Sequence, residues 1–127
     1  MMNYDKTHRP LVIFADDDED LLQLVKMKLS AEGLDVKLCL NGEKILPMIR
    51  SEKPDVVLLD ITMNGNDGRY ICKALKADSE TSSIPVILIS ANDNLPQIAL
   101  LYGADAYVPK PFNAFTIKQK IESLIAA

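Results

Sequence analysis

Cysteine and histidine are scarce in this sequence, which narrows the chemistry that it can carry. The two cysteines, Cys39 and Cys72, are spaced too far apart for a zinc-binding motif and are too few for a disulfide framework. We therefore expect both to be small buried hydrophobic residues. The single histidine, His8, lies in a polar segment at the start of the chain, where exposure is more typical than a ligand or catalytic role.

Long apolar runs and basic clusters are also missing. The longest apolar runs have the length of a β-strand, far below the roughly 20 residues that a transmembrane helix needs, and no charged-then-apolar leader opens the chain. The formal net charge of −4 argues against a nucleic-acid-binding surface. We therefore expect a cytoplasmic protein that binds neither membranes nor nucleic acids directly.

The composition that remains is that of an ordinary globular domain. A length of 127 residues suits one domain, and contents of 48% apolar and 25% charged residues are typical of such proteins. No internal repeat or linker interrupts the chain. We predict a flexible N-terminal tail over residues 1–10 and a single domain over residues 11–127.

Apolar segments rich in β-forming residues alternate five times with helical patterns. This alternation is typical of strand–helix units arranged around a parallel sheet. The first and third strand segments are continuously apolar, which indicates that helices cover both faces of the sheet. We therefore predict an α/β fold, a doubly wound (βα)5 three-layer α/β/α sandwich. The expected strands span residues 11–15, 34–40, 54–59, 84–89 and 105–108, and the expected helices span residues 18–32, 42–52, 67–77, 94–102 and 112–126.

Pro47 conflicts with a regular helix over residues 42–52. A proline inside a helix removes a hydrogen bond and costs about 3 kcal/mol, whereas a proline in the first turn is well tolerated. We therefore expect this second helix to be kinked or to begin late.

Polar residues with complementary chemistry follow four of the expected strands. Asp16 and Asp17 follow the first strand, Asp60 the third, Ser90 the fourth and Lys110 the fifth. In open parallel sheets the carboxyl ends of the strands share one rim, where ligands bind. Three carboxylates, a hydroxyl and an ammonium at this rim indicate divalent-metal and phosphoryl chemistry, and repulsion between the carboxylates favours an ion such as Mg²⁺ between them.

The acidic run over residues 16–20 fits two other kinds of site poorly. Asp16, Asp18 and Asp20 have the spacing of the first calcium ligands of an EF-hand loop, but Leu21 occupies the position of its turn glycine and Met27 that of its bidentate glutamate. A flavin-phosphate loop would present backbone N–H groups from a glycine-, serine- or threonine-rich turn and not a wall of negative charge. A flavodoxin-like redox carrier is therefore disfavoured.

The sequence resembles the receiver domain of bacterial two-component response regulators, the CheY-like domain, over residues 11–126. The resemblance implies a flavodoxin-like, five-stranded parallel sheet of order 2-1-3-4-5. The matching features are the pair Asp16-Asp17, Asp60 within the segment LLDITMNGNDG, Ser90-Ala91, and Lys110-Pro111-Phe112.

The resemblance implies that Asp60 is the phosphoacceptor. An ionised carboxylate can attack phosphorus directly to form an aspartyl phosphate. The donor would be the phosphohistidine of a sensor histidine kinase or of a histidine phosphotransfer protein. Mg²⁺, with Mn²⁺ as a substitute, would be bound by Asp16, Asp17, Asp60 and the backbone carbonyl of Thr62. Such a domain catalyses only its own phosphorylation and dephosphorylation and is not a turnover enzyme.

The resemblance also assigns roles to Lys110, Ser90 and Tyr107. Lys110 would place a positive charge on the phosphoryl oxygens and Ser90 would donate a hydroxyl hydrogen bond. The Lys110–Pro111 peptide bond should be cis, which would aim the ammonium into the site. On phosphorylation Ser90 would move toward the phosphoryl group and Tyr107 would turn inward, which changes the face formed by residues 94–102, 105–108 and 112–126.

Three positions concern the lifetime of the phosphoryl group or depart from the family pattern. Asn64 stands where the family often has proline, so the loop after the acceptor is expected to be more mobile. Thr62 and Asn92 occupy the positions that tune dephosphorylation, and neither offers a strong base for the attacking water, so we expect moderate to slow loss of the phosphoryl group. An aspartate-nucleophile Mg²⁺-dependent phosphatase is the alternative, but it requires a second acid where Thr62 stands.

Two forms of the protein fit this sequence. No output domain follows the last helix pattern, so we expect either a stand-alone receiver or one excised from a longer regulator. Its downstream partner is an unknown protein, and a phosphorylation-dependent homodimer is a further option.

Overall fold

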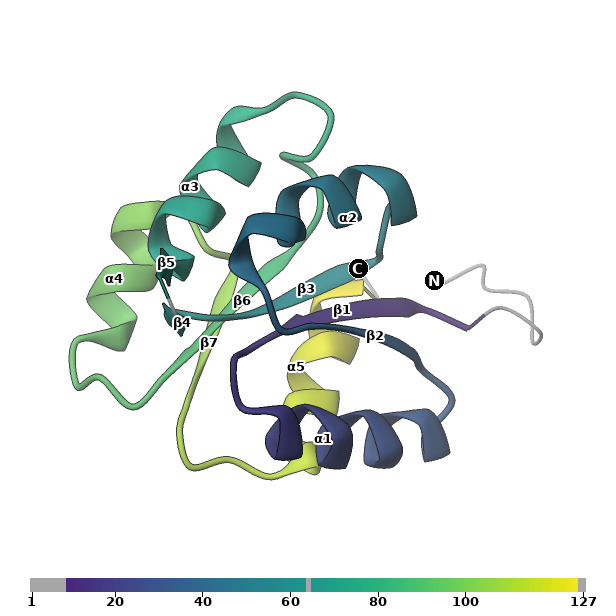
Figure 1. Ribbon diagram of the computed structural model, residues 1–127. Coiled ribbons are helices and arrows are strands. Elements are labelled where there is room, and N and C mark those ends of the chain that lie inside the picture. The colour runs from purple at the N-terminus through teal and green to yellow at the C-terminus, as the bar shows by residue number, and fades with distance from the viewer. Residues whose placement is uncertain (1–8, 64, 126–127) are drawn as a thin grey trace.

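The computed structural model describes residues 9–63 and 65–125, so His8 and Asn64 lie outside the described residues. Five parallel strands form one sheet, and their order β2-β1-β3-β6-β7 is the predicted 2-1-3-4-5 when only these strands are counted (Figure 1). The predicted α/β sandwich is therefore confirmed. The strands of this sheet are β1 (Leu11–Ala15), β2 (Asp35–Cys39), β3 (Val56–Asp60), β6 (Val86–Ser90) and β7 (Ala106–Pro109).

A helix follows each strand of the main sheet, and the helices form two layers. One layer lies below the sheet in Figure 1, and the other lies above the sheet and at its left edge. The lower layer contains α1 (Glu19–Ala31) and α5 (Ala114–Ile125), and the upper layer contains α2 (Ile45–Glu52), α3 (Gly68–Ala77) and α4 (Leu95–Tyr102).

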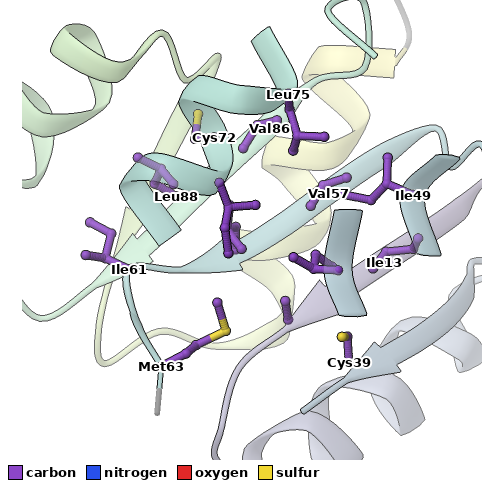
Figure 2. Packing of buried hydrophobic residues seen from close by; sticks show 14 of the residues in the cluster. Ile13, Cys39, Ile49, Val57, Ile61, Met63, Cys72, Leu75, Val86 and Leu88 are labelled. Carbon is purple, nitrogen blue, oxygen red and sulfur yellow. The ribbon is translucent and has the colours of Figure 1, made fainter. Parts of the chain in front are cut away.

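Side-chain alternation along the central strands divides the core between the two faces of the sheet. In β1, Ile13 points to the cluster under α2, α3 and α4, whereas Phe14 belongs to the cluster under α1 and α5. Figure 2 shows the first cluster, to which Val57 and Leu88 contribute from neighbouring strands and Leu75 contributes from α3. Because both faces are buried, the strands need apolar residues at every position, which explains the continuous apolar runs.

The helix boundaries follow the capping residues. The side chain of Asp18 accepts a hydrogen bond from the backbone N–H of Leu21 at the start of α1. The second helix begins late, as Pro47 predicted: a 3₁₀ turn, η1 (Gly42–Lys44), precedes α2, so Pro47 lies in the first turn of the α-helix. Gly103 ends α4 at a φ of 80°, a left-handed conformation that glycine adopts without strain.

A short antiparallel hairpin after β3 was not expected from the sequence. It pairs β4 (Thr62–Met63) with β5 (Asn66–Asp67) directly between Asp60 and α3. Two-residue strands show no hydrophobic periodicity, so the pattern analysis could not distinguish them from a loop.

The packed part of the chain begins before residue 11, the predicted start of the domain. The sequence analysis assigned Arg9 and Pro10 to the tail, but Pro10 is buried and its carbonyl accepts a hydrogen bond from the backbone N–H of Asp35. The Arg9 side chain pairs with the carboxylate of Asp35 at 2.8 Å. These two residues therefore continue the packing of β1 and β2.

Two further expectations can be compared with the described residues. Cys39 and Cys72 are free and buried, as predicted. Among the helices of the described segments, none is both long enough and apolar enough to cross a membrane.

Candidate functional site

The strand ends bring the predicted site residues to one rim of the sheet. Asp16 and Asp17 directly follow β1, Asp60 is the last residue of β3, and Ser90 is the last residue of β6. Lys110 follows β7, and its backbone N–H donates to the carbonyl of Ser90 at 2.9 Å. Residues far apart in the sequence are therefore neighbours because the parallel strands end together.

Three carboxylates at this rim form a compact acidic cluster. One carboxylate oxygen from each of Asp16, Asp17 and Asp60 lies within 4.8 Å of the other two. Asp16 is fully buried and Asp60 is 4% exposed, whereas Asp17 is exposed to solvent. Hard oxygen ligands on one open side of a pocket suit Mg²⁺, which retains several waters and takes only a few carboxylates from a protein.

Lys110 provides the positive charge of the site. Its Nζ lies 3.1 Å from Oδ2 of Asp16 and 3.6 Å from Oδ2 of Asp60. The ammonium is only partly exposed and therefore interacts with both carboxylates in a medium less polar than water. The Lys110–Pro111 peptide bond is cis, as predicted.

The two oxygens of Asp16 have separate partners. Oδ1 accepts a hydrogen bond from the backbone N–H of Asp18 at 3.0 Å, and Oδ2 accepts from Lys110. The backbone N–H of Asp16 donates to the carbonyl of Cys39 at the end of β2. Asp16 is thus held in one orientation, with its carboxylate directed at the cluster.

Burial and charge shift the pKa of Asp60. Desolvation raises the pKa of this carboxyl, the neighbouring charge of Asp16 raises it further, and Lys110 lowers it, with a final value of about 6. Burial by itself would lower the pKa of Lys110, but the hydrogen bond and charge of Asp16 raise it above its ordinary value. At neutral pH the site therefore contains an ionised but poorly solvated Asp60 carboxylate beside a firmly protonated lysine.

The remaining predicted residues surround the cluster. The Ser90 hydroxyl is buried and its oxygen accepts the backbone N–H of Asn92 at 3.0 Å, while the exposed Asn92 side chain accepts the N–H of Asn94. Thr62 is exposed, and its N–H approaches Oδ1 of Asp60 at 3.4 Å. Tyr107, on β7, is 39% exposed and lies on the outer surface and not in the pocket.

Gly68 lies at the start of the helix expected over residues 67–77, but its contact with Asp60 was not predicted from the sequence. A Cβ atom at this position would collide with the backbone carbonyl oxygen of Asp60. The N–H of Gly68 also donates to the carbonyl of Ile61 at 2.8 Å. The pair Asp67-Gly68 is the only sequence signal, and it has the same form at any capped helix, so the contact required the tertiary structure.

A comparison with known protein families shows which family the chain belongs to. A family model described as "Response regulator receiver domain" matches residues 12–122. The chain belongs to the response regulator receiver domain family. This receiver domain is therefore a signalling domain of a two-component system, and domains of this family bind Mg²⁺ at an acidic pocket and have a histidine kinase or phosphotransfer protein as partner.

Individual relatives agree with the family assignment. The receiver domain is 34% identical over 108 residues to the DNA-binding response regulator MtrA of Mycolicibacterium smegmatis, with coverage of 84% of this chain and 46% of MtrA. The chain thus spans about half the length of this relative. The receiver domain of Francisella response regulator 1452 superimposes with a TM-score of 0.85 at 30% identity, with 93% of this chain and 98% of that chain covered.

A more distant structure supports the fold alone. The chemotaxis response regulator CheY4 of Vibrio cholerae has a TM-score of 0.85 at 23% identity, with 92% of this chain and 99% of that chain covered. The CheY-like fold that the sequence indicated is thereby confirmed.

The raised pKa of Asp60 predicts the pH dependence of the Asp60→Asn variant in Mg²⁺-free buffer. Below the ordinary value of 3.8 the carboxyl is neutral in both the folded and unfolded states, and above a pH of about 6 only the folded state bears the cost of ionisation. The variant should therefore gain stability over the wild type as the pH rises from about 4 to 7. The rise of the Asp60 pKa from 3.8 to about 6 corresponds to at most about 3 kcal/mol. Urea denaturation at pH 4 and pH 7 measures the difference in unfolding free energy between the variant and the wild type.

Asp78→Asn is the matched control for this prediction. The backbone N–H of Glu80, with Arg50, lowers the pKa of Asp78, so its contribution to stability is present above the ordinary pKa and lost as the pH falls. Asp78→Asn should therefore lose stability relative to the wild type as the pH rises. An Asp60→Asn effect that is constant with pH, or that has the sign of the control, would contradict the assigned environment.

Proposed function

We propose that this receiver domain accepts a phosphoryl group on Asp60 from the phosphohistidine of a sensor histidine kinase or a histidine phosphotransfer protein. The observation that carries the proposal is the convergence of two other carboxylates within 4.8 Å and the Lys110 ammonium at 3.6 Å on the carboxylate of Asp60. No simpler structural role explains why a strand of four apolar residues ends in a nearly buried carboxylate between two charged neighbours.

The transfer is a displacement at phosphorus. An ionised oxygen of Asp60 attacks the phosphorus atom and forms the new O–P bond of an acyl phosphate. The P–N bond to the donor histidine breaks, and its electron pair returns to the imidazole nitrogen. The pKa of about 6 leaves most of the Asp60 carboxylate ionised at neutral pH, while its burial keeps water from solvating the attacking oxygen.

The carboxylates of Asp16, Asp17 and Asp60 and the backbone carbonyl of Thr62 are the residues that would hold Mg²⁺, or Mn²⁺ in its place. Their fit is supported by the donor chemistry, since three carboxylates converge at the pocket and a single lysine amine offsets only part of their charge. When bound, the ion neutralises negative charge on the phosphoryl oxygens. Asp16 contributes either directly or through a water, because both of its oxygens already accept hydrogen bonds.

Lys110 and Ser90 stabilise the transferred group. Lys110 lies between Asp16 and Asp60, so a short movement of its flexible side chain brings the ammonium to an oxygen of the incoming phosphoryl group. The Ser90 oxygen accepts a backbone N–H, which leaves its O–H as the group that donates to the phosphoryl oxygen. Neither residue exchanges a proton in the transfer.

The signal passes to the face formed by α4, β7 and α5. Ser90 lies at the end of β6 beside β7, where Tyr107 is exposed, so movement of Ser90 toward the phosphoryl group is coupled to an inward turn of Tyr107. A groove of about 510 Å³ on this face is lined by Pro96, Leu100, Tyr107 and Lys120, among others. The downstream partner is a protein that binds this face, and a second copy of the chain is one such partner.

Phosphorylation by a small-molecule donor tests the acceptor assignment. Incubation with acetyl phosphate and Mg²⁺ should add one phosphoryl group to the wild type and none to Asp60→Asn, because the amide lacks the nucleophilic oxygen charge. Intact mass spectrometry measures the change, and omission of Mg²⁺ is the control for the metal. A mass gain that survives the Asp60→Asn substitution would remove Asp60 from its role.

Substitution of one carboxylate tests the metal site. Asp17→Asn should weaken Mg²⁺ binding by at least about tenfold, because it removes a charged oxygen ligand from the exposed side of the pocket. Asp18→Asn is the matched control, since Asp18 is the neighbouring acidic residue but caps α1 through the N–H of Leu21. Isothermal titration calorimetry gives both affinities. Equal affinities for the two variants would place the ion elsewhere.

The lifetime of the phosphorylated protein tests the roles of Thr62 and Asn92. Neither side chain is a base that could activate the attacking water, so the half-life in the presence of Mg²⁺ should be minutes or longer. The decay of the phosphorylated mass after removal of acetyl phosphate measures it. A half-life of only seconds would show that another group activates the water.

A further inference from the structure

The segment between the acceptor and α3 packs closely against both of its neighbours. We use the name acceptor loop for its described residues, 61–63 and 65–68. Ile61 and Met63 are buried in the core, at the carboxyl end of β3 in Figure 2. At the other end of the loop, Gly68 lies against the backbone carbonyl of Asp60. The loop is thus attached at both ends to the strand that carries the acceptor.

The middle of the acceptor loop contacts a different part of the chain. Asn66, on β5, packs against Gly42, the buried first residue of η1 after strand β2. A Cβ atom at position 42 would lie 2.5 Å from the Cβ and 2.7 Å from the Cγ of Asn66. Side-chain carbons in ordinary contact lie about 3.5–4.0 Å apart, so this space holds a glycine and no other residue.

A collision at this point could not be relieved by rotation of a side chain. The Cβ atom of Asn66 is fixed by its own backbone, so an alanine at position 42 must push the backbones of η1 and β5 apart. The hairpin transmits that displacement, because Met63 pairs with Asn66 and Thr62 pairs with Asp67. Thr62 in turn lies directly beside Asp60, with its N–H 3.4 Å from Oδ1 of the carboxylate.

We propose that Gly42 and Asn66 are positioning residues of the phosphorylation site: their contact sets the place of the β4–β5 hairpin and thereby of the Thr62 backbone at the metal-binding rim. This inference rests on the proposed function, since it assigns the geometry of one of the Mg²⁺ ligands. The residues act through the hairpin and touch neither the ion nor the phosphoryl group. The start of η1 therefore contributes to the site although it follows β2, which supplies none of the predicted site residues.

The Gly42→Ala variant is the direct test. Displacement of the hairpin should weaken Mg²⁺ binding by about tenfold, the lower range for residues that orient metal ligands. The rate of phosphorylation by acetyl phosphate at saturating Mg²⁺ should change less, because Asp60, Asp17 and Lys110 all remain. Calorimetry gives the affinity, and intact mass against time gives the rate.

A second substitution in the same contact separates positioning from general damage. Gly42→Ala combined with Asn66→Gly should restore the affinity to within about threefold of wild type, because the colliding Cβ is gone. Gly42→Ala combined with Asn66→Ala should not restore it, since alanine retains that atom. Asn66→Gly and Asn66→Ala alone report any separate contribution of the amide and of backbone flexibility.

Gly33→Ala is the control for stability. Gly33 adopts a φ of 93° in the turn between α1 and β2, and a Cβ there would contact nothing within 4 Å. The variant should therefore lower the melting temperature through backbone strain and leave the Mg²⁺ affinity unchanged. Unchanged affinity in Gly42→Ala, rescue by both double variants or by neither, or an equal loss of affinity in Gly33→Ala would each overturn the proposal.

The outcomes distinguish this inference from the proposed function. A wild-type protein that binds no Mg²⁺ and gains no phosphoryl group on Asp60 would refute the proposed function itself. A wild-type protein that does both, with a Gly42→Ala variant that binds Mg²⁺ equally well, would refute only the role of the Gly42–Asn66 contact.

Discussion

The balance of charge between Asp16, Asp60 and Lys110 is the constraint on which the site depends. Burial of the Asp60 carboxyl raises its pKa, the charge of the buried Asp16 raises it further, and the Lys110 ammonium offsets this only in part, so the pKa of Asp60 is about 6. Asp17 adds a third carboxylate on the open side of the cluster. The site thus retains an excess of negative charge, which suits it to a divalent cation.

The parallel sheet makes this balance attainable. Strands β1, β3, β6 and β7 end at one rim, and the charged and polar groups lie at the last residue of a strand or directly after it. Helices on both faces bury the strands, so the side chains at the strand ends lie in a partly apolar environment. The same packing that stabilises the domain therefore raises the pKa of Asp60.

Much of this arrangement follows from patterns in the sequence, and the exceptions have identifiable causes. Continuous apolar runs such as that before Asp60 predicted buried parallel strands, and Pro47 predicted the late start of α2. The β4–β5 hairpin was not predicted, because strands of two residues are too short to show a hydrophobic period. Gly42 and Gly68 were recognised only as helix starts, since a glycine needed for close approach has the same sequence context as one needed for a turn.

The amino-acid sequence by itself determined the order and type of the elements of the main sheet and its two helical layers, the family resemblance and the five polar residues at the strand ends, because these depend on local periodicity and residue chemistry. Only the tertiary structure decided which of the carboxylates are buried, that Lys110 contacts both Asp16 and Asp60, and that Asn66 packs on Gly42. These features depend on distances between segments remote in the chain, and desolvation and steric contact act through those distances, which no local pattern encodes.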